Sequence, residues 1–399
     1  MTPDTTQRGP EHQVRITTEP RTGLSFDDVL LVPQRTTLRS RRQADLTTEL
    51  MPGLRLRIPV VSANTQWCTG DRMAVGMALN GGLGVLHRMQ TVDQQAGQLR
   101  AVKTYEPTAE ERAAGATLDA AGRLVAGAAI GVTGDWRERS ERLVAGGADL
   151  LVVDVAHGHS DQVLETVAEL RRSHPALPLM AGNVATAAGT RDLAEAGADL
   201  VKVGIGPGGV CTTRLVAGTG VPQLTAVLDC AAEAARHGVR VIADGGIRQA
   251  GDIAKALAAG ACAVMIGSLL AGAEESEAVT VERDGRTYKT SRGFVSLGME
   301  LTLRRAAGEK ITRAEVDDYV PEGVEATFAY TGSLARTLRQ LTGGVQSALS
   351  YSGATGLDAF RERAEFVRVT PAGQVENTPH VRARTEHIDI DHVAEAVNG

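Results

Sequence analysis

Eight short apolar runs, most of which end in glycine or a polar residue, recur along the chain and limit the folds open to it. The runs are apolar throughout, which is typical of strands buried on both faces of a parallel sheet. Helical patterns lie between most of them, so the sequence predicts an α/β fold, a (β/α)8 TIM barrel. The predicted strands span residues 58–64, 82–88, 128–132, 149–157, 178–184, 199–206, 240–247 and 263–270.

An open, doubly wound sheet is the alternative reading of the same pattern. Residues that could take part in catalysis or binding follow many different strands. Only in a barrel do all the carboxyl ends of the strands meet at one mouth. Eight units and this distribution of chemistry favour the barrel.

Two segments interrupt the repeat, and together with the chain ends they suggest the domain plan. We expect a polar linker at 103–123 and, after the last strand, a long mobile flap that is charged and poor in strands. The predicted plan is a disordered leader at 1–20, the barrel at 21–273, the flap at 274–330, the last barrel helices at 331–370 and a tail at 371–399.

Charge and cysteine content exclude several classes of protein. The net charge is -6 and the pI about 5.9, so a nucleic-acid or anionic-membrane surface is not expected. No apolar run is long enough to span a bilayer, and the first residues have no signal-peptide core. The four cysteines include no CxxC pair, which indicates a reducing cytoplasm.

The segment KVGIGPGGVCTTR, residues 202–214, places a thiol at the end of a glycine-rich loop. A tight barrel turn is the plain interpretation of the glycines. A loop with few side chains can also bring its backbone close to a flat substrate, and Cys211 would then be a nucleophile. Backbone N–H groups and a cation such as Arg214 would favour its thiolate.

Two further loops follow the seventh and eighth predicted strands. They read ADGGI (243–247) and IGS (266–268), and loops at these places commonly bind phosphate in such barrels. Asp244 would repel a phosphate and suits sugar hydroxyls better. The residues alone therefore indicate a phosphorylated sugar compound with a planar electrophilic group near Cys211.

These motifs together resemble the IMP dehydrogenase/GMP reductase family over about residues 22 to 370. The resemblance rests on GLSFDDVLLVP, AGNVAT, the thiol loop, VPQLTAV, IADGGI followed by GDIAKALAAGA, VMIGSLLAG and VPEG. It implies a cysteine that attacks C2 of a purine nucleotide. Dehydrogenases of the family pass a hydride from C2 to NAD and then hydrolyse the intermediate, whereas reductases expel ammonia and accept a hydride from NADPH.

The resemblance assigns a role to each matching residue. Cys211 would be the nucleophile, and Thr213 with Glu322 would move protons on the leaving amine. The implied contacts of the nucleotide are Ser62, Thr65, Trp67, Gly209, Asp244, Gly246, Gly267, Ser268, Gly293, Phe294 and Val295. The implied contacts of the nicotinamide cofactor are Asp154, Ala156, Asn183, Gly204 and Gly206, and the carbonyls of Gly206, Gly208 and Cys211 would hold a potassium ion.

Reductase and dehydrogenase features are mixed. The Arg-Tyr pair with which the dehydrogenases activate water is absent between Gly298 and Val320, and SAN (62–64) and DVAHGHS (154–160) resemble the reductases. VPEG and the length of the flap resemble the dehydrogenases. Their regulatory CBS pair is absent, because only residues 103–123 stand at its insertion point. Family barrels form tetramers, so we expect a homotetramer.

The departures from the family cluster at the phosphate and at the five-membered ring of the purine. The usual MDT is Thr65, Gln66 and Trp67, a usual serine is Gly209, a usual tyrosine is Ser291, and the usual flap turn GMG or GMS is residues 293–295. The sequence therefore predicts NADPH-dependent reductive deamination of GMP or of a 7-substituted 7-deazaguanine nucleotide, as in nucleoside antibiotic pathways. IMP dehydrogenase activity, or a nucleotide-binding regulator without turnover, are the alternatives.

Overall fold

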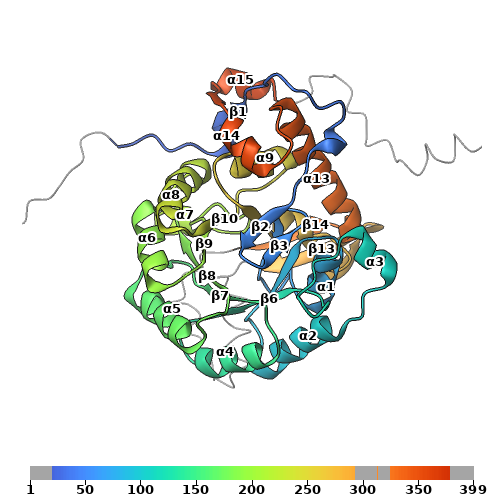
Figure 1. Cartoon of the computed structure of the whole chain (residues 1–399), viewed down its shortest axis with the longest axis vertical. Helices are drawn as coiled ribbons and strands as arrows, with labels where there is room; N and C mark the ends of the chain where they lie inside the picture. The colour runs from blue at the N-terminus through green and yellow to red at the C-terminus, as the bar shows by residue number, and fades with distance from the viewer. Residues whose placement is uncertain (1–19, 293–311, 313–323, 378–399) are drawn as a thin grey trace, which may run out of the picture.

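The eight predicted strands form a closed barrel of parallel neighbours (Figure 1). The computed structural model describes residues 20–292, 312 and 324–377. This architecture confirms the predicted (β/α)8 fold. The barrel strands are β4 (Val60–Ser62), β5 (Leu83–Leu86), β6 (Ala126–Ile130), β7 (Leu150–Asp154), β8 (Leu179–Val184), β9 (Leu200–Val203), β10 (Arg240–Asp244) and β11 (Ala263–Ile266).

A ring of helices surrounds the barrel, because each helix has one apolar face to bury. In α5, for example, Val163, Val167 and Leu170 recur at helical spacing and all are buried. After β11 the short α10 (Ser268–Ala271) precedes the ring helix α13, which packs between α9 and α1. The ring helices are α1 (Asp71–Leu79), α2 (Val92–Thr104), α4 (Trp136–Ala145), α5 (Asp161–Ser173), α6 (Ala187–Ala196), α8 (Gln223–His237), α9 (Ala250–Ala258) and α13 (Leu334–Tyr351).

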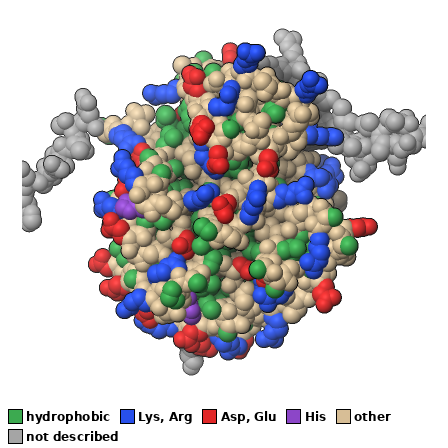
Figure 2. Space-filling view, viewed as in Figure 1, with side chains coloured by type: hydrophobic (Ala, Val, Ile, Leu, Met, Phe, Trp, Pro, Cys, Tyr) green, Lys and Arg blue, Asp and Glu red, His purple; other side chains and the backbone are tan. Residues whose placement is uncertain are grey.

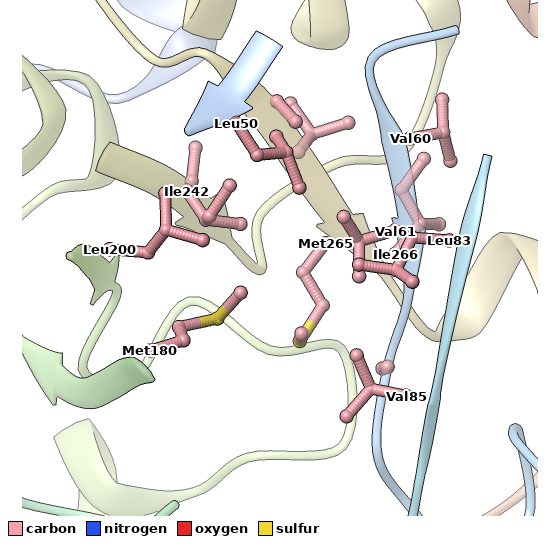
Figure 3. Close-up of a cluster of buried hydrophobic side chains, with 14 of the residues drawn as sticks. Leu50, Val60, Val61, Leu83, Val85, Met180, Leu200, Ile242, Met265 and Ile266 are labelled. Carbon is pink, nitrogen blue, oxygen red and sulfur yellow. The ribbon is translucent and has the colours of Figure 1, made fainter. Parts of the chain in front are cut away.

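The inside of the barrel is a packed apolar core that a hairpin closes at the amino ends of the strands. The hairpin is β2 (Thr48–Met51) and β3 (Leu54–Leu56). The Thr48 hydroxyl donates to the carbonyl of Cys262 at 2.8 Å, just before β11 begins. Leu50 is fully buried, and Figure 3 shows it among side chains from several barrel strands. The opposite end of the barrel, where the carboxyl ends of the strands lie, is the end at which barrels of this kind carry their functional sites.

The chain ends add small elements outside the ring. Strand β1 (Val29–Leu31) pairs in antiparallel fashion with β15 (Phe366–Arg368), which ties residues near the two ends of the described chain together. The remaining short elements are the 3-10 helices η1 (Phe26–Asp28) and η2 (Arg41–Gln43) and the helices α3 (Ala109–Ala114), α7 (Thr213–Val216), α14 (Leu357–Arg363) and α15 (Pro371–Val375).

The segment expected to be poor in strands contains an antiparallel sheet, so that expectation was wrong. The sheet consists of β12 (Val279–Arg283), β13 (Arg286–Arg292) and β14 (Glu325–Ala329). A two-residue turn with positive φ at Asp284 and Gly285 joins the first two strands. This geometry suits the right-handed twist of a hairpin. Most of the predicted flap, residues 293–311 and 313–323, lies outside the described residues.

The predicted linker at 103–123 is packed onto the barrel and holds no second domain. It contains α3, and its Leu118 forms a β-bridge with Leu124, the residue that follows the segment. Lys103 is buried at its start, and its ammonium contacts Asp119 at 3.0 Å and Asp149 at 2.9 Å. This triad joins α2, the linker and the residue before β7, so the segment is an integral part of the fold.

Replacing Lys103 with methionine is expected to destabilise the fold by about 3 kcal/mol, because it leaves two largely buried carboxylates without their cation. Burial opposes ionisation, yet the Arg123 backbone N–H and the Lys103 ammonium lower the pKa of Asp119 to about 2. This carboxylate therefore contributes stability above its unfolded pKa of about 4, which is lost as the pH falls toward about 2. Urea unfolding at several pH values measures both effects. An unchanged unfolding midpoint would contradict the prediction.

The surface shows no concentration of one charge on the face in view. Figure 2 shows acidic and basic side chains interspersed over the side from which Figure 1 is drawn. Among the residues that the structure describes, no helix combines the length and apolar character needed to cross a membrane.

Candidate active site

A cavity of ≈ 650 Å³ opens at the carboxyl ends of the barrel strands. Loops after five of the eight strands and Asn183 of β8 contribute to its wall, as expected for a site at the mouth of a barrel. The cavity collects most of the residues predicted from the sequence. Those that line it are Thr65, Trp67, Asp154, Ala156, Asn183, Gly204, Gly206, Gly208, Gly209, Cys211, Thr213, Asp244, Gly246, Gly267 and Ser268.

The thiol loop carries Cys211 and Thr213 side by side. The Cys211 Sγ lies 3.1 Å from the Thr213 Oγ1, and the Cys211 N–H donates to the Gly208 carbonyl at 3.1 Å. Gly206 has a φ of 83°, and a Cβ there would approach the Arg214 side chain to 2.5 Å. The loop thus needs glycine to pass this close to its neighbours.

Arg214, the cation expected beside the thiol, hydrogen-bonds to backbone carbonyls at the two ends of the loop. Its guanidinium donates to the Val221 carbonyl at 2.7 Å and to the Ile205 carbonyl at 3.4 Å. The side chain thus joins the two ends of the thiol loop, and the residue also lines the cavity. Its role in this structure is to hold the loop.

A buried ion cluster forms the wall next to the thiol loop. The Lys202 ammonium lies 2.7 Å from Asp154 and 2.7 Å from Asp244, and it also donates to the Asn183 side chain. Burial opposes both ionised forms, but the pKa of Lys202 is raised by the two carboxylates. The pKa of Asp154 is lowered by Lys202 and Arg88. Both groups are therefore charged, and the cluster is rigidly hydrogen-bonded.

Asp244 stands where β10 leads into the glycine pair of the predicted phosphate loop. Its Oδ2 accepts from Asn183 Nδ2 at 2.9 Å in addition to Lys202, and its side chain is 20% exposed. Gly245 and Gly246 follow with φ values of 88° and 77°. A carboxylate that is fixed by hydrogen bonds and still partly exposed can accept further hydrogen bonds from sugar hydroxyls.

The thiol loop and the two predicted phosphate loops meet. A Cβ on Gly209 would lie 2.7 Å from the Ser268 Oγ, and a Cβ on Gly245 would lie 3.0 Å from Pro207. Gly209 and Gly245 have no room for a side chain at these contacts, so the loops approach closely and backbone forms part of the cavity wall. Such backbone-rich concave surfaces suit an anionic group.

Trp67 packs between the cavity and the flap sheet. Its ring stacks on Phe328 with centroids 6.1 Å apart, and only 6% of the residue is exposed. A Cβ on Gly267 would come within 2.8 Å of the ring, so glycine at that position makes room for the tryptophan. Of the two roles open to Trp67 in the sequence, the structure displays the one of filling space at the edge of the cavity.

Some predicted residues are elsewhere or cannot be placed. Ser62 is fully buried, accepts from the Thr69 hydroxyl at 2.8 Å and does not line the cavity. Glu322, Gly293, Phe294 and Val295 lie outside the described residues. Two positions after Glu322, the Val324 N–H donates to the Val210 carbonyl at 2.9 Å, beside Cys211.

The structure also reveals residues that the sequence analysis did not single out. Lys202, Gln223 and Phe328 line the cavity. Lys202 had a sequence signal, because a lysine inside an otherwise apolar strand is rarely buried without a carboxylate partner. Phe328 belongs to a strand that was not predicted, so nothing in the sequence connected it with the site.

The described part of the chain contains no group of three His, Cys, Asp or Glu residues arranged to hold a metal ion. Of the three carbonyls proposed for potassium, that of Gly208 lies inside the turn that carries the thiol and accepts the Cys211 N–H.

Alkylation of the native protein is expected to modify Cys211 alone. Cys211 is partly exposed, whereas Cys68, Cys230 and Cys262 are buried. Burial raises the pKa of Cys68 and of Cys230 to about 12 and that of Cys262 to about 11. Because the thiolate is the reacting form, these three should be inert. Peptide mapping after brief iodoacetamide treatment checks this, and equal labelling of a second cysteine would contradict it.

Comparison with known proteins adds family information to this geometry. The sequence model described as the IMP dehydrogenase/GMP reductase domain matches residues 23–380. The chain is 39% identical to inosine-5'-monophosphate dehydrogenase of Staphylococcus saprophyticus, over 90% of this chain and 95% of that protein. The Bacillus subtilis enzyme of the same name gives the same identity and coverage.

A solved structure matches as well. A cysteine-to-alanine variant of GMP reductase from Trypanosoma brucei, in complex with guanosine 5'-monophosphate, superimposes with a TM-score of 0.84 and 33% sequence identity. The match covers 91% of this chain and 99% of that one. The fold and most of its length are therefore shared with that protein.

Proposed function

The chain belongs to the IMP dehydrogenase/GMP reductase family of oxidoreductases, and from this premise we propose that it deaminates a guanine nucleotide reductively at C2. The substrate is GMP or a 7-substituted 7-deazaguanine nucleotide, and the reductant is NADPH. The products are the corresponding hypoxanthine-type nucleotide and ammonia. The observation that carries the proposal is the Cys211–Thr213 pair, with Asp244 and backbone-rich loops, in one cavity.

The proposed chemistry starts at Cys211. Its sulfur adds to C2, and the exocyclic amine leaves as ammonia after it gains a proton. The Thr213 hydroxyl, 3.1 Å from the sulfur, is placed to pass this proton, and Glu322 is its proposed partner. A hydride then adds to C2 and the thiolate departs, which restores the enzyme. The glycines allow a flat base to approach the loop closely enough for the covalent bond.

The remaining side chains would bind and orient. Asp244 would hold the ribose hydroxyls, and the backbone around Gly209, Gly246, Gly267 and Ser268 would hold the phosphate. A nicotinamide cofactor supplies the hydride when bound. The residues proposed for it fit such a group, because Asp154, Ala156, Asn183, Gly204 and Gly206 line the same cavity as the thiol.

The absence of the Arg-Tyr pair from the flap sequence supports reductase over dehydrogenase chemistry. Without a means to activate water, hydrolysis of the covalent intermediate would be slow, and the hydride would reach it first. IMP oxidation by NAD is the second candidate, because the curated relatives named above are dehydrogenases.

Two unsatisfied donors support an altered nucleotide. The Thr65 hydroxyl and the Trp67 indole N–H are buried at the cavity wall, and neither has a hydrogen-bond partner among the described residues. They stand where the family sequence usually reads MDT. Because a buried polar group without a partner is costly, a substrate that carries an extra acceptor would satisfy them.

Initial rates with paired substrates test the proposal. NADPH oxidation is followed with GMP and with a 7-cyano- or 7-carboxy-7-deazaguanine nucleotide, and NAD reduction is followed with IMP. Oxidation with either guanine-type nucleotide supports the reductase, and the preferred one identifies the base. Turnover with IMP and NAD alone would replace the reductase by the dehydrogenase.

A further inference from the structure

Gln223 links the ends of the two strands that carry the thiol loop and Asp244. It is the first residue of α8 and is 3% exposed. Its Nε2 donates to the Val203 carbonyl at 2.9 Å and to the Asp244 carbonyl at 3.1 Å. Val203 ends β9 and Asp244 ends β10, so one amide group spans both strands at the floor of the cavity.

This bridge continues where the sheet stops. The pairing of β9 with β10 ends at Val203 and Ala243. At the next residue the backbones are in direct contact, because a Cβ on Gly204 would lie 2.0 Å from the Asp244 carbonyl oxygen. The Gln223 amide lies beside the same contact, 3.1 Å from that Cβ position. The Gln223 amide therefore links the two strands by hydrogen bonds at the point where their backbone pairing has ended, just before the two functional loops.

The oxygen atom of the Gln223 side-chain amide takes no part in this bridge. Gln223 Oε1 is buried and has no hydrogen-bond partner among the described residues. The residue lines the cavity, and its Cβ and Cγ lie about van der Waals distance from the Gly246 Cβ position. An amide oxygen can only accept, so the group that satisfies it must be a donor such as a hydroxyl.

We propose that Gln223 is a positioning residue that sets Cys211 against Asp244 and, through its open Oε1, takes a hydrogen bond from a hydroxyl of the bound nucleotide. Only the identity of the ligand in this inference rests on the proposed function. The bridge between the two loops stands on the hydrogen bonds alone.

Gln95 offers a matched control. It is also fully buried, and its Nε2 donates to the carbonyls of Leu86 at 3.3 Å and Ala129 at 2.9 Å, at the ends of β5 and β6. Its Oε1 already accepts from Arg139 at 2.7 Å. The same chemistry thus bridges two strands that carry neither the thiol nor Asp244.

The test compares Gln223→Met, Gln223→Glu and Gln95→Met with the wild type. The measurements are the melting temperature, the dissociation constants of GMP and IMP by calorimetry, the rate of Cys211 alkylation, and kcat and KM where turnover is found. Gln223→Met keeps the length of the side chain but loses the amide. Gln223→Glu keeps an acceptor and loses the donor that bridges the carbonyls.

We expect both Gln223 variants, which lose the bridging donor, to change the Cys211 alkylation rate by about tenfold. Only Gln223→Met also loses the acceptor, so it should weaken nucleotide binding by about tenfold, the size of one lost hydrogen bond. Gln95→Met should lower the melting temperature and leave both quantities unchanged. Unchanged alkylation and binding in folded Gln223 variants, or equal changes in Gln95→Met, would overturn the proposal. Alkylation needs no substrate, so failure of the proposed reaction would leave this readout decisive.

Discussion

Replacement of Cys211 with alanine is expected to lower turnover by about a thousandfold or more, with nucleotide binding retained. The reason is that Cys211 is the only cysteine among the described residues that line the cavity. The three remaining cysteines are buried, and Thr213, which lies 3.1 Å from the thiol, is a far weaker nucleophile. Steady-state rates and calorimetric binding of the nucleotide measure the two effects separately.

Cys230→Ala is the matched control for this prediction. Cys230 is a buried thiol of α8 whose pKa burial raises to about 12, so its removal should leave turnover intact. A Cys211→Ala protein with wild-type turnover would exclude covalent chemistry at this thiol. A wild type that binds nucleotides without any turnover, and binds them equally well after Cys211→Ala, would favour the regulator.

Replacement of Lys202 with methionine is expected to destabilise the fold by about 3–5 kcal/mol and to reduce activity as well. The ammonium lies 2.7 Å from each of two carboxylates, and the change leaves both without it. Asp244 and Asp154 would then repel each other, and Asp244 would lose its fixed position. Thermal unfolding reports the first effect, and the KM for the nucleotide reports the second.

Lys103→Met separates these two effects, because Lys103 also bridges two aspartates but lies far along the chain from the thiol loop. It should lose stability with unchanged kinetics per folded molecule. If Lys202→Met kept wild-type stability and KM, the ion cluster would have neither role.

The ion cluster also predicts a pH dependence of stability. The pKa of Asp154 is lowered in the fold, so its contribution exists above the unfolded value of about 4 and is lost as the pH falls. The pKa of Lys202 is raised, so its contribution exists below its unfolded value of about 10.4 and is lost at still higher pH. Stability should therefore be greatest between these limits.

The barrel strands could be predicted because a strand buried on both faces is apolar at nearly every position, which gives a continuous apolar run in the sequence. The three-stranded sheet was missed, although VTVERDGRTYKT carries an Asp-Gly turn between alternating residues. The charged composition of the segment concealed that local signal. Strand β14 pairs with β13 from far along the chain, and such pairing leaves no local trace in a sequence.

Residue type and loop context predicted many of the residues that line the cavity, but they could not predict the direction of individual side chains. Cys211 and Asp244 could be chosen because a thiol and a carboxylate stood in glycine-rich loops. Ser62, which the resemblance implied as a nucleotide contact, is fully buried and does not line the cavity, because the last residue of a barrel strand can face either side of the sheet. Arg214, expected as a cation beside the thiol, donates hydrogen bonds to backbone carbonyls of its own loop.

The central claim is that Cys211 couples loss of ammonia to consumption of NADPH. The most direct test measures ammonia release and NADPH oxidation together, with the preferred guanine-type nucleotide, in the wild type and in Cys211→Ala. The account predicts equal amounts of both in the wild type and neither in the variant. NADPH oxidation without ammonia, or the same yields from Cys211→Ala, would contradict it.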